Sequence, residues 1–280
     1  MKTLNLFQSG DGSWVTSATL LAIFEKVKAS EASVLYIHSG LNFGTPNPNL
    51  GRKELLGHLY SLIASLGVPT ICFPTFTFSF CNKEDYNVQT SRSKMGALNE
   101  YVRGLPEAVR SEDPLMSSIV VGTDHDLVHN LGKDSIGANS TFDKLHQRGS
   151  GVKFLFFGVT VSDCFTYTHY VEERLNTPYR YNRAFSGRIT NGSHSRQDTY
   201  RLFVRYHGVV PSSNGLLESD LLRRGSLQKV PCGEASIACL AEPEGYETIL
   251  EHLTANPRCY IAEDPGDKNT EFTVQNMVSL

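Results

Sequence analysis

Residues 152–173 read VKFLFFGVTVSDCFTYTHYVEE, and this stretch sets the class of fold. Its first part, residues 152–161, is almost continuously apolar, which is typical of a strand buried on both faces of a sheet. A helix is expected directly afterwards, near residues 168–175, with Thr166 or Thr168 at its N-terminus. A buried strand followed by a helix is the unit from which sheets covered by helices are built.

The same alternation extends towards the N-terminus. Further strands are predicted at residues 34–38, 70–80 and 117–121. Helices are predicted at residues 49–66, 95–104, 107–110 and 140–148, the last of them opened by the capping box Ser140-Thr-Phe-Asp143. This order predicts a layered α/β sheet with helices on both faces.

The second half of the chain changes character. Residues 200–206 alternate like a half-exposed strand, and residues 214–227 and 244–253 are predicted to be helices. No Gly/Ser linker, internal repeat or low-complexity tract interrupts the sequence. We therefore expect one domain over residues 1–280, with a core at about 30–180 and a C-terminal elaboration at about 181–280.

Composition and charge exclude several classes of protein. The chain has 26 basic and 29 acidic residues, so it lacks the basic excess of a nucleic-acid clamp. Its longest apolar run, residues 154–161, is far short of the roughly 20 residues that span a bilayer, and no signal peptide is visible. The six cysteines form no CxxC pair and no zinc-like spacing. We expect a cytoplasmic protein with reduced thiols, no metal, and no nucleic-acid or membrane partner.

The segment after the buried strand carries the clearest candidate for catalysis. His169 falls in the first turn of the predicted helix, with Glu172 at i+3 and Glu173 at i+4 on the same face. The helix N-terminus disfavours an imidazolium, whereas a neighbouring carboxylate favours it. The sequence leaves open which effect wins, and a purely structural His–Glu pair is the alternative.

Six short motifs follow one another along the chain. In order they are His38-Ser-Gly-Leu…Gly44, Pro74-Thr-Phe-Thr-Phe-Ser79, Ser93-Lys-Met-Gly-Ala-Leu98, Arg110-Ser-Glu-Asp-Pro…Ser117, Ser140…Asp143-Lys-Leu145 and Gly158-Val…Thr-His169-Tyr-Val-Glu172. This series resembles the aminoglycoside 3-N-acetyltransferase family, also called the antibiotic N-acetyltransferase family. The resemblance covers nearly the whole chain, and Gly233 and Pro257 fit its looser C-terminal pattern.

The resemblance implies a three-layer α/β/α fold with a central mixed sheet, and an enzyme that transfers an acetyl group directly from acetyl-CoA to an amine of a sugar-like acceptor. It makes His169 the general base and Glu172 the residue that orients it, and it leaves a homodimer open. An attacking amine must lose a proton, which suits a base tuned near neutrality. The implied cofactor-binding residues are Ser39, Gly40, Leu41, Phe43, Gly44, Ser117, Ser118 and Ile119, and the implied substrate-binding residues are Thr75, Asp85, Ser93 and Glu173.

Two departures from the family pattern affect the expected acceptor. Ser91-Arg-Ser93 stands where Thr-Pro-Ser is usual, and Asp113-Pro114 stands where His-Pro is usual. These features resemble the branch associated with surface-polysaccharide or nucleotide-sugar biosynthesis, so an amino-sugar precursor is the expected acceptor. Aminoglycoside inactivation and a non-catalytic CoA- or sugar-binding relative are the alternatives, and O-acetylation and a longer acyl chain also stay open.

A few other residues carry two interpretations. Cys164 could form an acyl-enzyme, but a free cysteine is more often a small buried apolar residue. His38 could line the site or be a hydrogen-bonded structural residue. His125 and His129 have i, i+4 spacing but no metalloprotease signature, so we interpret them as a solvated face. A solvated face is also the simpler interpretation of three arginines that could otherwise contact an acceptor phosphate: Arg180, Arg183 and Arg188.

Overall fold

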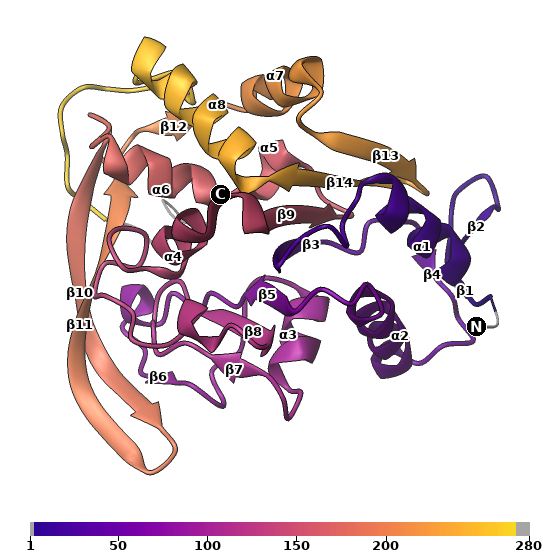
Figure 1. The fold of residues 1–280 in the computed structure, drawn as a ribbon. Coiled ribbons are helices and arrows are strands. Elements are labelled where there is room, and N and C mark those ends of the chain that lie inside the picture. The colour runs from indigo at the N-terminus through magenta and orange to yellow at the C-terminus, as the bar shows by residue number, and fades with distance from the viewer. Residues whose placement is uncertain (1–2, 273–280) are drawn as a thin grey trace.

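The computed structural model describes residues 3–272, and its centre is a seven-stranded mixed sheet (Figure 1). The strand order is β13-β14-β9-β3-β5-β8-β7. The three central strands β9, β3 and β5 run parallel, and the outer strands are antiparallel to their neighbours. The seven strands are β3 (Val34–Ser39), β5 (Thr70–Pro74), β7 (Val109–Arg110), β8 (Ser118–Gly122), β9 (Val152–Phe157), β13 (Gln228–Cys232) and β14 (Ala235–Ala241).

Helices cover both faces of this sheet, because successive strand residues face opposite sides. In β3, Leu35 and Ile37 belong to one apolar core, which also contains residues of α1, α2 and α3, whereas Tyr36 belongs to the other, with residues of α4, α6 and α8. The predicted three-layer α/β/α fold is confirmed. The helices are α1 (Ser17–Lys26), α2 (Arg52–Ala64), α3 (Ala97–Arg103), α4 (Thr141–Arg148), α5 (Val161–Cys164), α6 (Tyr167–Arg174), α7 (Leu216–Arg224) and α8 (Glu242–Ala255), with short 3-10 turns η1 (Phe80–Asn82), η2 (His125–Leu127) and η3 (Gly149–Gly151).

Three small sheets surround the central one. The largest element among them is the antiparallel hairpin of β10 (Arg180–Asn191) and β11 (His194–Arg205), which starts soon after α6 and projects along one side of the molecule (Figure 1). Its register places Arg180 opposite Arg205. The remaining strands are β1 (Asn5–Gln8), β2 (Trp14–Thr16), β4 (Thr45–Pro46), β6 (Tyr86–Asn87), β12 (Val210–Pro211) and β15 (Ile261–Glu263).

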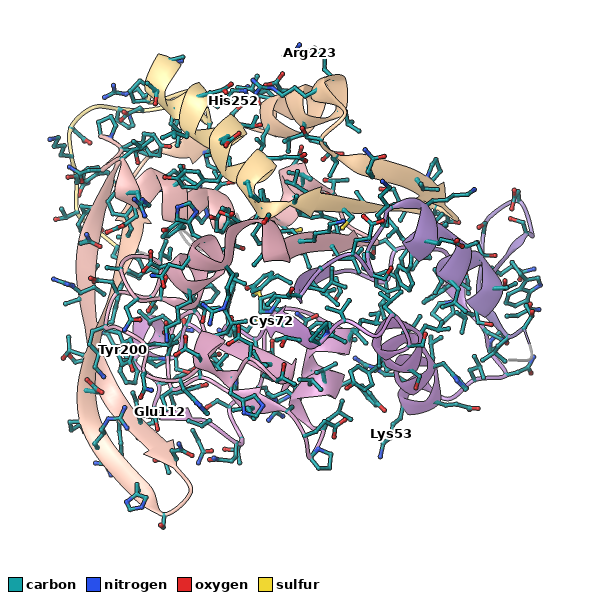
Figure 2. All side chains as sticks on the ribbon, in the orientation of Figure 1. Lys53, Cys72, Glu112, Tyr200, Arg223 and His252 are labelled. Atoms are coloured by element: carbon teal, nitrogen blue, oxygen red, sulfur yellow. The ribbon has the colours of Figure 1, made fainter. Side chains whose placement is uncertain are left out.

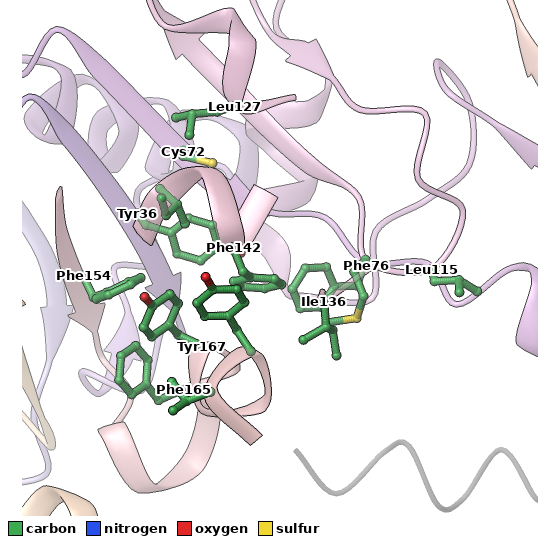
Figure 3. Close-up of a cluster of buried hydrophobic side chains, with 14 of the residues drawn as sticks. Tyr36, Cys72, Phe76, Leu115, Leu127, Ile136, Phe142, Phe154, Phe165 and Tyr167 are labelled. Atoms are coloured by element: carbon green, nitrogen blue, oxygen red, sulfur yellow. The ribbon is translucent and has the colours of Figure 1, made fainter. Parts of the chain in front are cut away.

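Most of the interior is apolar, and many long charged side chains point outward. Figure 2 shows Lys53 and Arg223 reaching away from the ribbon, while Cys72 lies inside it. Within the described residues all six cysteines are free, and four of them are buried. Figure 3 shows the aromatic centre of one core, where the rings of Tyr36, Phe154, Phe165 and Tyr167 gather. No helix within residues 3–272 is both long and apolar enough to cross a membrane.

Three predicted elements differ from the structure. The strand expected at 70–80 ends at Pro74, and the chain cannot stay extended to residue 80 because Phe78 adopts a left-handed φ of 53°. Residues 107–110 are not helical, since Val109–Arg110 pairs with β8 as β7. The strand expected at 152–161 ends at Phe157, where Gly158 turns the chain with a φ of 74°.

The other predicted helices and strands are present with shifted ends. Ser140 caps α4 as predicted, with its hydroxyl accepting from Asp143 N at 3.2 Å. The reciprocal bond of a capping box is not made, because Asp143 Oδ2 accepts from Asn139 N at 2.8 Å instead. The C-terminal part of the chain adds β13 and β14 to the central sheet, next to β9. The boundary expected near residue 180 stays a prediction.

Gly158 fixes the approach of two loops that frame the site. A Cβ there would lie 2.1 Å from the Gly40 carbonyl oxygen, which is a steric clash. Residue 158 also has a positive φ, which is unfavourable for any residue with a side chain. We predict that Gly158→Ala lowers the free energy of unfolding by at least about 2 kcal/mol more than Gly225→Ala does. Gly225 has a left-handed α conformation and open space around it, so its substitution costs only about 1–2 kcal/mol. Urea unfolding of both variants measures this, and equal losses would contradict the close-approach argument.

Candidate active site

The chain between β9 and α6 brings His169 to the carboxyl end of the central sheet. Thr160 and Asp163 cap the short helix α5 reciprocally, and Thr166 then stands as N-cap of α6. His169 lies in the first turn, with its backbone N–H donating to Thr166 O at 2.9 Å. Of the two N-cap residues predicted, the structure has Thr166.

His169 and Glu172 form a close pair. His169 Nδ1 lies 2.6 Å from Glu172 Oε2, and the two side chains are 18% and 3% exposed. A carboxylate can only accept a hydrogen bond, so Nδ1 carries the proton in this contact. In the neutral ring, Nε2 therefore keeps its lone pair.

Two further residues hold the Glu172 carboxylate. The Tyr179 hydroxyl donates to Oε1 at 2.6 Å, and Arg180 Nε lies 2.9 Å from Oε2. Arg180 also donates to the Phe203 carbonyl at 3.0 Å, which fixes its guanidinium, and its Nη2 lies 3.0 Å from His169 Nδ1. Glu172 is thus a buried anion paired with a buried cation, and it orients the ring of His169.

The electrostatics of this group favour a neutral His169. Burial of the ring lowers the pKa of His169, Arg180 lowers it further, and Glu172 opposes both effects. Burial alone would raise the pKa of Glu172, but Arg180 and His169 bring it down to about 2. The carboxylate is therefore ionised and the neutral imidazole is able to accept a proton. The catalytic role of the pair stays a prediction.

A cavity of about 120 Å³ opens beside this pair. Its walls come from α5, the start of α6, the paired ends of the β10–β11 hairpin, and two C-terminal segments. The charged residues that line it are Glu172, Arg180 and Arg205, and the uncharged lining includes Ser162, Cys164, Thr166, Thr168, Ser212, Asn214 and Tyr260. Burial and the nearby Arg180 lower the pKa of Arg205 to about 10, so this guanidinium is charged at neutral pH.

A second cavity, of about 70 Å³, lies at the carboxyl ends of β3 and β5. Cys164 and Thr166 line both cavities, so the two share one wall. The Ser39 hydroxyl donates to Asn99 Oδ1 at 2.5 Å, and Asn99 Nδ2 donates to Pro74 O at 2.7 Å, which fixes the floor. The lining consists of His38, Ser39, Pro74, Phe76, Met95, Asn99, Cys164 and Thr166.

The loop predicted to bind cofactor lies partly at this second cavity. Ser39 lines it, and Gly40 and Leu41 follow, half-buried, against the turn after β9. Phe43 has no exposed surface and packs against Phe7 and Phe157. Together with Gly44, which lies against the backbone of residue 8, Phe43 anchors the loop; contact of either with a cofactor stays a prediction.

Four other predicted positions are enclosed in the fold. Ser117, Ser118 and Thr75 have essentially no exposed surface, and Ser117 Oγ donates to Thr75 O at 2.7 Å. Ile119 belongs to a hydrophobic core on β8. None of the four lines either cavity, so their roles in binding stay predictions without a contact to support them.

Three predicted acceptor contacts lie outside both cavities. Asp85 is exposed and accepts from Arg188 N at 3.3 Å. Ser93 is half-buried, and its hydroxyl accepts from Met95 N at 3.1 Å. Glu173 is half-buried on the side of α6 near Gly137, where burial raises the pKa of its carboxyl. The structure does not bring these three together with His169.

Sequence reasoning missed several members of the site. Arg180 is not a solvated cation but a buried partner of Glu172, with its side chain 8% exposed. Tyr179, Arg205 and Tyr260 were not singled out either. Tyr179 directly precedes β10 and Arg205 ends β11, so both positions depend on where the hairpin pairs. Tyr260 comes from far along the chain and has no local signal.

The remaining candidates are Cys164 and the pair His125 and His129. The Cys164 thiol donates to Thr160 O at 3.2 Å, and burial raises its pKa, which disfavours the thiolate that an acyl-enzyme needs. His125 and His129 are exposed. Within residues 3–272, no group of three or more His, Cys, Asp or Glu side chains is placed to hold a metal ion.

The chain matches one family model and several solved structures. A family model described as aminoglycoside 3-N-acetyltransferase matches residues 61–254. No curated protein matches the sequence. Among solved structures, AAC-IIIb in a binary complex with CoASH matches with a TM-score of 0.72 at 15% identity, over 89% of this chain and 98% of that one.

Two further solved structures agree in fold. The apoenzyme of aminoglycoside acetyltransferase AAC(3)-IVa has a TM-score of 0.69 at 17% identity, over 96% of both chains. The YokD protein from Bacillus subtilis has a TM-score of 0.69 at 15% identity, over 92% of this chain and 97% of that one. The family match spans more than half of the chain, so this protein belongs to the aminoglycoside 3-N-acetyltransferase family.

Proposed function

We propose that this protein acetylates an amine of an aminoglycoside-type acceptor by direct transfer from acetyl-CoA, with His169 as the general base. Membership of the family makes the chain an acetyl-CoA-dependent N-acetyltransferase. The observation that carries the rest is the 2.6 Å contact of His169 Nδ1 with the buried Glu172, beside a cavity. That contact leaves Nε2 as the acceptor for a proton.

The proposed reaction uses the residues of this site as follows. Nε2 of His169 takes the proton that the acceptor amine loses as its nitrogen bonds to the acetyl carbon. The C–S bond then breaks and coenzyme A leaves as the thiolate. Glu172 holds the ring in one tautomer and stabilises the imidazolium that forms, while Tyr179 and Arg180 keep the carboxylate in place.

Direct transfer is favoured over an acyl-cysteine intermediate. Cys164 lies in the wall shared by both cavities, which is where such an intermediate would form. Burial raises the pKa of its thiol, however, and its Sγ–H is already donated to a backbone carbonyl. A thiol in that state is a poor nucleophile.

The family favours an aminoglycoside acceptor over the polysaccharide precursor expected from the sequence. The relatives support this choice, since an AAC(3)-IVa variant has been solved in complex with a gentamicin. The charges beside His169 favour a second candidate, an amino sugar that also carries an anionic group. Arg180 and Arg205 both line that cavity, and Glu172 is the carboxylate among its lining residues.

Thiol release from acetyl-CoA across an acceptor panel tests the proposal. The panel holds aminoglycosides, free amino sugars and nucleotide-linked amino sugars. We predict turnover with aminoglycosides, and a fall in kcat of at least about 100-fold in His169→Ala, because the base is lost. Turnover confined to the nucleotide-linked sugars would instead support the anionic acceptor.

A matched control separates catalysis from stability in this experiment. His146 forms a second His–Glu pair, with Nδ1 2.8 Å from Glu242 Oε1, and it lines neither cavity. His146→Ala is expected to keep kcat within about threefold of the parent. Full activity of His169→Ala on every acceptor would contradict the assignment of the base.

The acid limb of kcat/KM reports the pKa of His169 in the free enzyme. The ring is active when neutral, and its pKa is lowered, so we predict that activity persists below pH 6.5 and is lost only at more acidic pH. The charged groups that face the ring are Glu172, Arg180 and Arg205. Arg180→Met removes a nearby positive charge and should raise the midpoint pH of the acid limb by about 1 unit.

Arg188→Met provides the control for that shift. Arg188 lies on the same strand as Arg180 but is exposed and lines neither cavity. Its substitution should leave the acid limb in place. An acid limb of the parent above pH 6.5, or a downward shift in Arg180→Met, would contradict the proposed electrostatics.

A further inference from the structure

His38 is a buried polar side chain that the proposed mechanism does not use. It is 4% exposed at the carboxyl end of β3. Its ring stacks on Phe156, with centroids 5.3 Å apart and an interplanar angle of 8°, and meets Phe165 edge-on at 6.0 Å. These aromatic contacts fix the plane of the imidazole at one wall of the smaller cavity.

One nitrogen atom of this ring, Nε2, is not used to hold the fold together. Nε2 is enclosed and has no hydrogen-bond partner within residues 3–272. A structural histidine at such a position would normally be hydrogen-bonded, because an unsatisfied buried polar group costs about 1–3 kcal/mol. Burial lowers the pKa of His38 to about 3, so the ring is neutral and has one N–H donor at working pH.

The smaller cavity adjoins the one beside His169. It shares Cys164 and Thr166 with the cavity beside His169, so a group held in it lies across one wall from the general base. Its volume of about 70 Å³ suits a small acyl group better than a sugar. Apart from His38, its polar side chains already have partners. Ser39 and Asn99 are hydrogen-bonded to each other, and the Thr166 hydroxyl and the Cys164 thiol donate to backbone carbonyls.

We propose that His38 donates a hydrogen bond from its neutral ring to the thioester carbonyl oxygen of acetyl-CoA, bound in the cavity between β3 and Cys164. This inference rests on the proposed function and assigns a further catalytic residue to it. The amine forms its bond to the carbonyl carbon, its proton goes to His169, and the C–S bond breaks to release the thiolate. His38 keeps its proton throughout and stabilises the negative charge that develops on the oxygen.

His169 and His38 would then have different roles in the reaction, because their neighbouring residues differ. His169 contacts a carboxylate that stabilises its protonated form, so it can take up a proton. His38 is surrounded by aromatic rings and has no carboxylate partner within residues 3–272, so it can only donate or accept a hydrogen bond. A neutral imidazole in an apolar site is a strong donor at the moment when charge develops on its partner.

The vibration of the bound thioester tests this contact without turnover. Acetyl-CoA labelled with ¹³C at the carbonyl is bound to the parent protein in the absence of acceptor, and its infrared difference spectrum is recorded. A hydrogen bond lowers the carbonyl stretching frequency, so we expect a value at or below that of free acetyl-CoA in water. His38→Phe keeps a stacking ring but has no donor, and should raise the frequency.

Kinetics of a small set of variants complete the test. We expect His38→Phe to lower kcat by about 100-fold, with the KM for acetyl-CoA within about threefold of the parent and the acid limb unmoved. His38→Gln restores an N–H donor, so its kcat should be at least tenfold higher than that of His38→Phe. Tyr36→Phe, at a neighbouring ring that does not line the cavity, should leave kcat unchanged.

The outcomes separate this inference from the function on which it rests. A carbonyl frequency above the aqueous value in the parent, or a kcat of His38→Phe within threefold of the parent, would overturn the role of His38 alone. The spectrum of the parent decides the matter even if His38→Phe fails to fold. A parent that binds no acetyl-CoA would overturn the inference and the proposed function together.

Discussion

The site depends on one buried negative charge, the carboxylate of Glu172, which is 3% exposed. An ionised carboxylate is removed from water at a cost that only close partners can offset. Tyr179, Arg180 and His169 supply those partners. Tyr179 comes from the segment between α6 and β10, Arg180 from the start of β10, and His169 from α6 itself. The requirement to satisfy this one charge therefore joins α6 to the β10–β11 hairpin.

The contact between α6 and the β10–β11 hairpin places the candidate catalytic residues at one wall of the cavity. β9 delivers the chain to the carboxyl end of the sheet, α5 and the turn at Phe165 redirect it, and α6 presents His169. The hairpin leaves beside α6 at Arg180 and returns at Arg205, so its paired ends close one side of the cavity. Its positive charges lower the pKa of His169, and the carboxylate between them opposes that effect.

The local parts of this account could be predicted from the sequence, and the long-range parts could not. The apolar run at 152–161 predicted β9, and the spacing of His169 and Glu172 predicted their contact, because both depend on neighbours within a few residues. The strand expected at 70–80 was too long, since the hydroxyls of Thr75 and Thr77 bond to segment 114–117. Arg180 was interpreted as solvated for the same reason: its partner depends on where a hairpin folds back.

The state of His169 is the most direct test of the account. Long-range ¹H–¹⁵N spectra of the ¹⁵N-histidine-labelled protein, recorded across a pH titration, report which ring nitrogen carries the proton and when the second one binds. The account predicts a proton on Nδ1 and a bare Nε2 at pH 7, with a second proton bound only below pH 6.5. A ring that carries its proton on Nε2, or that becomes doubly protonated above pH 6.5, would contradict it.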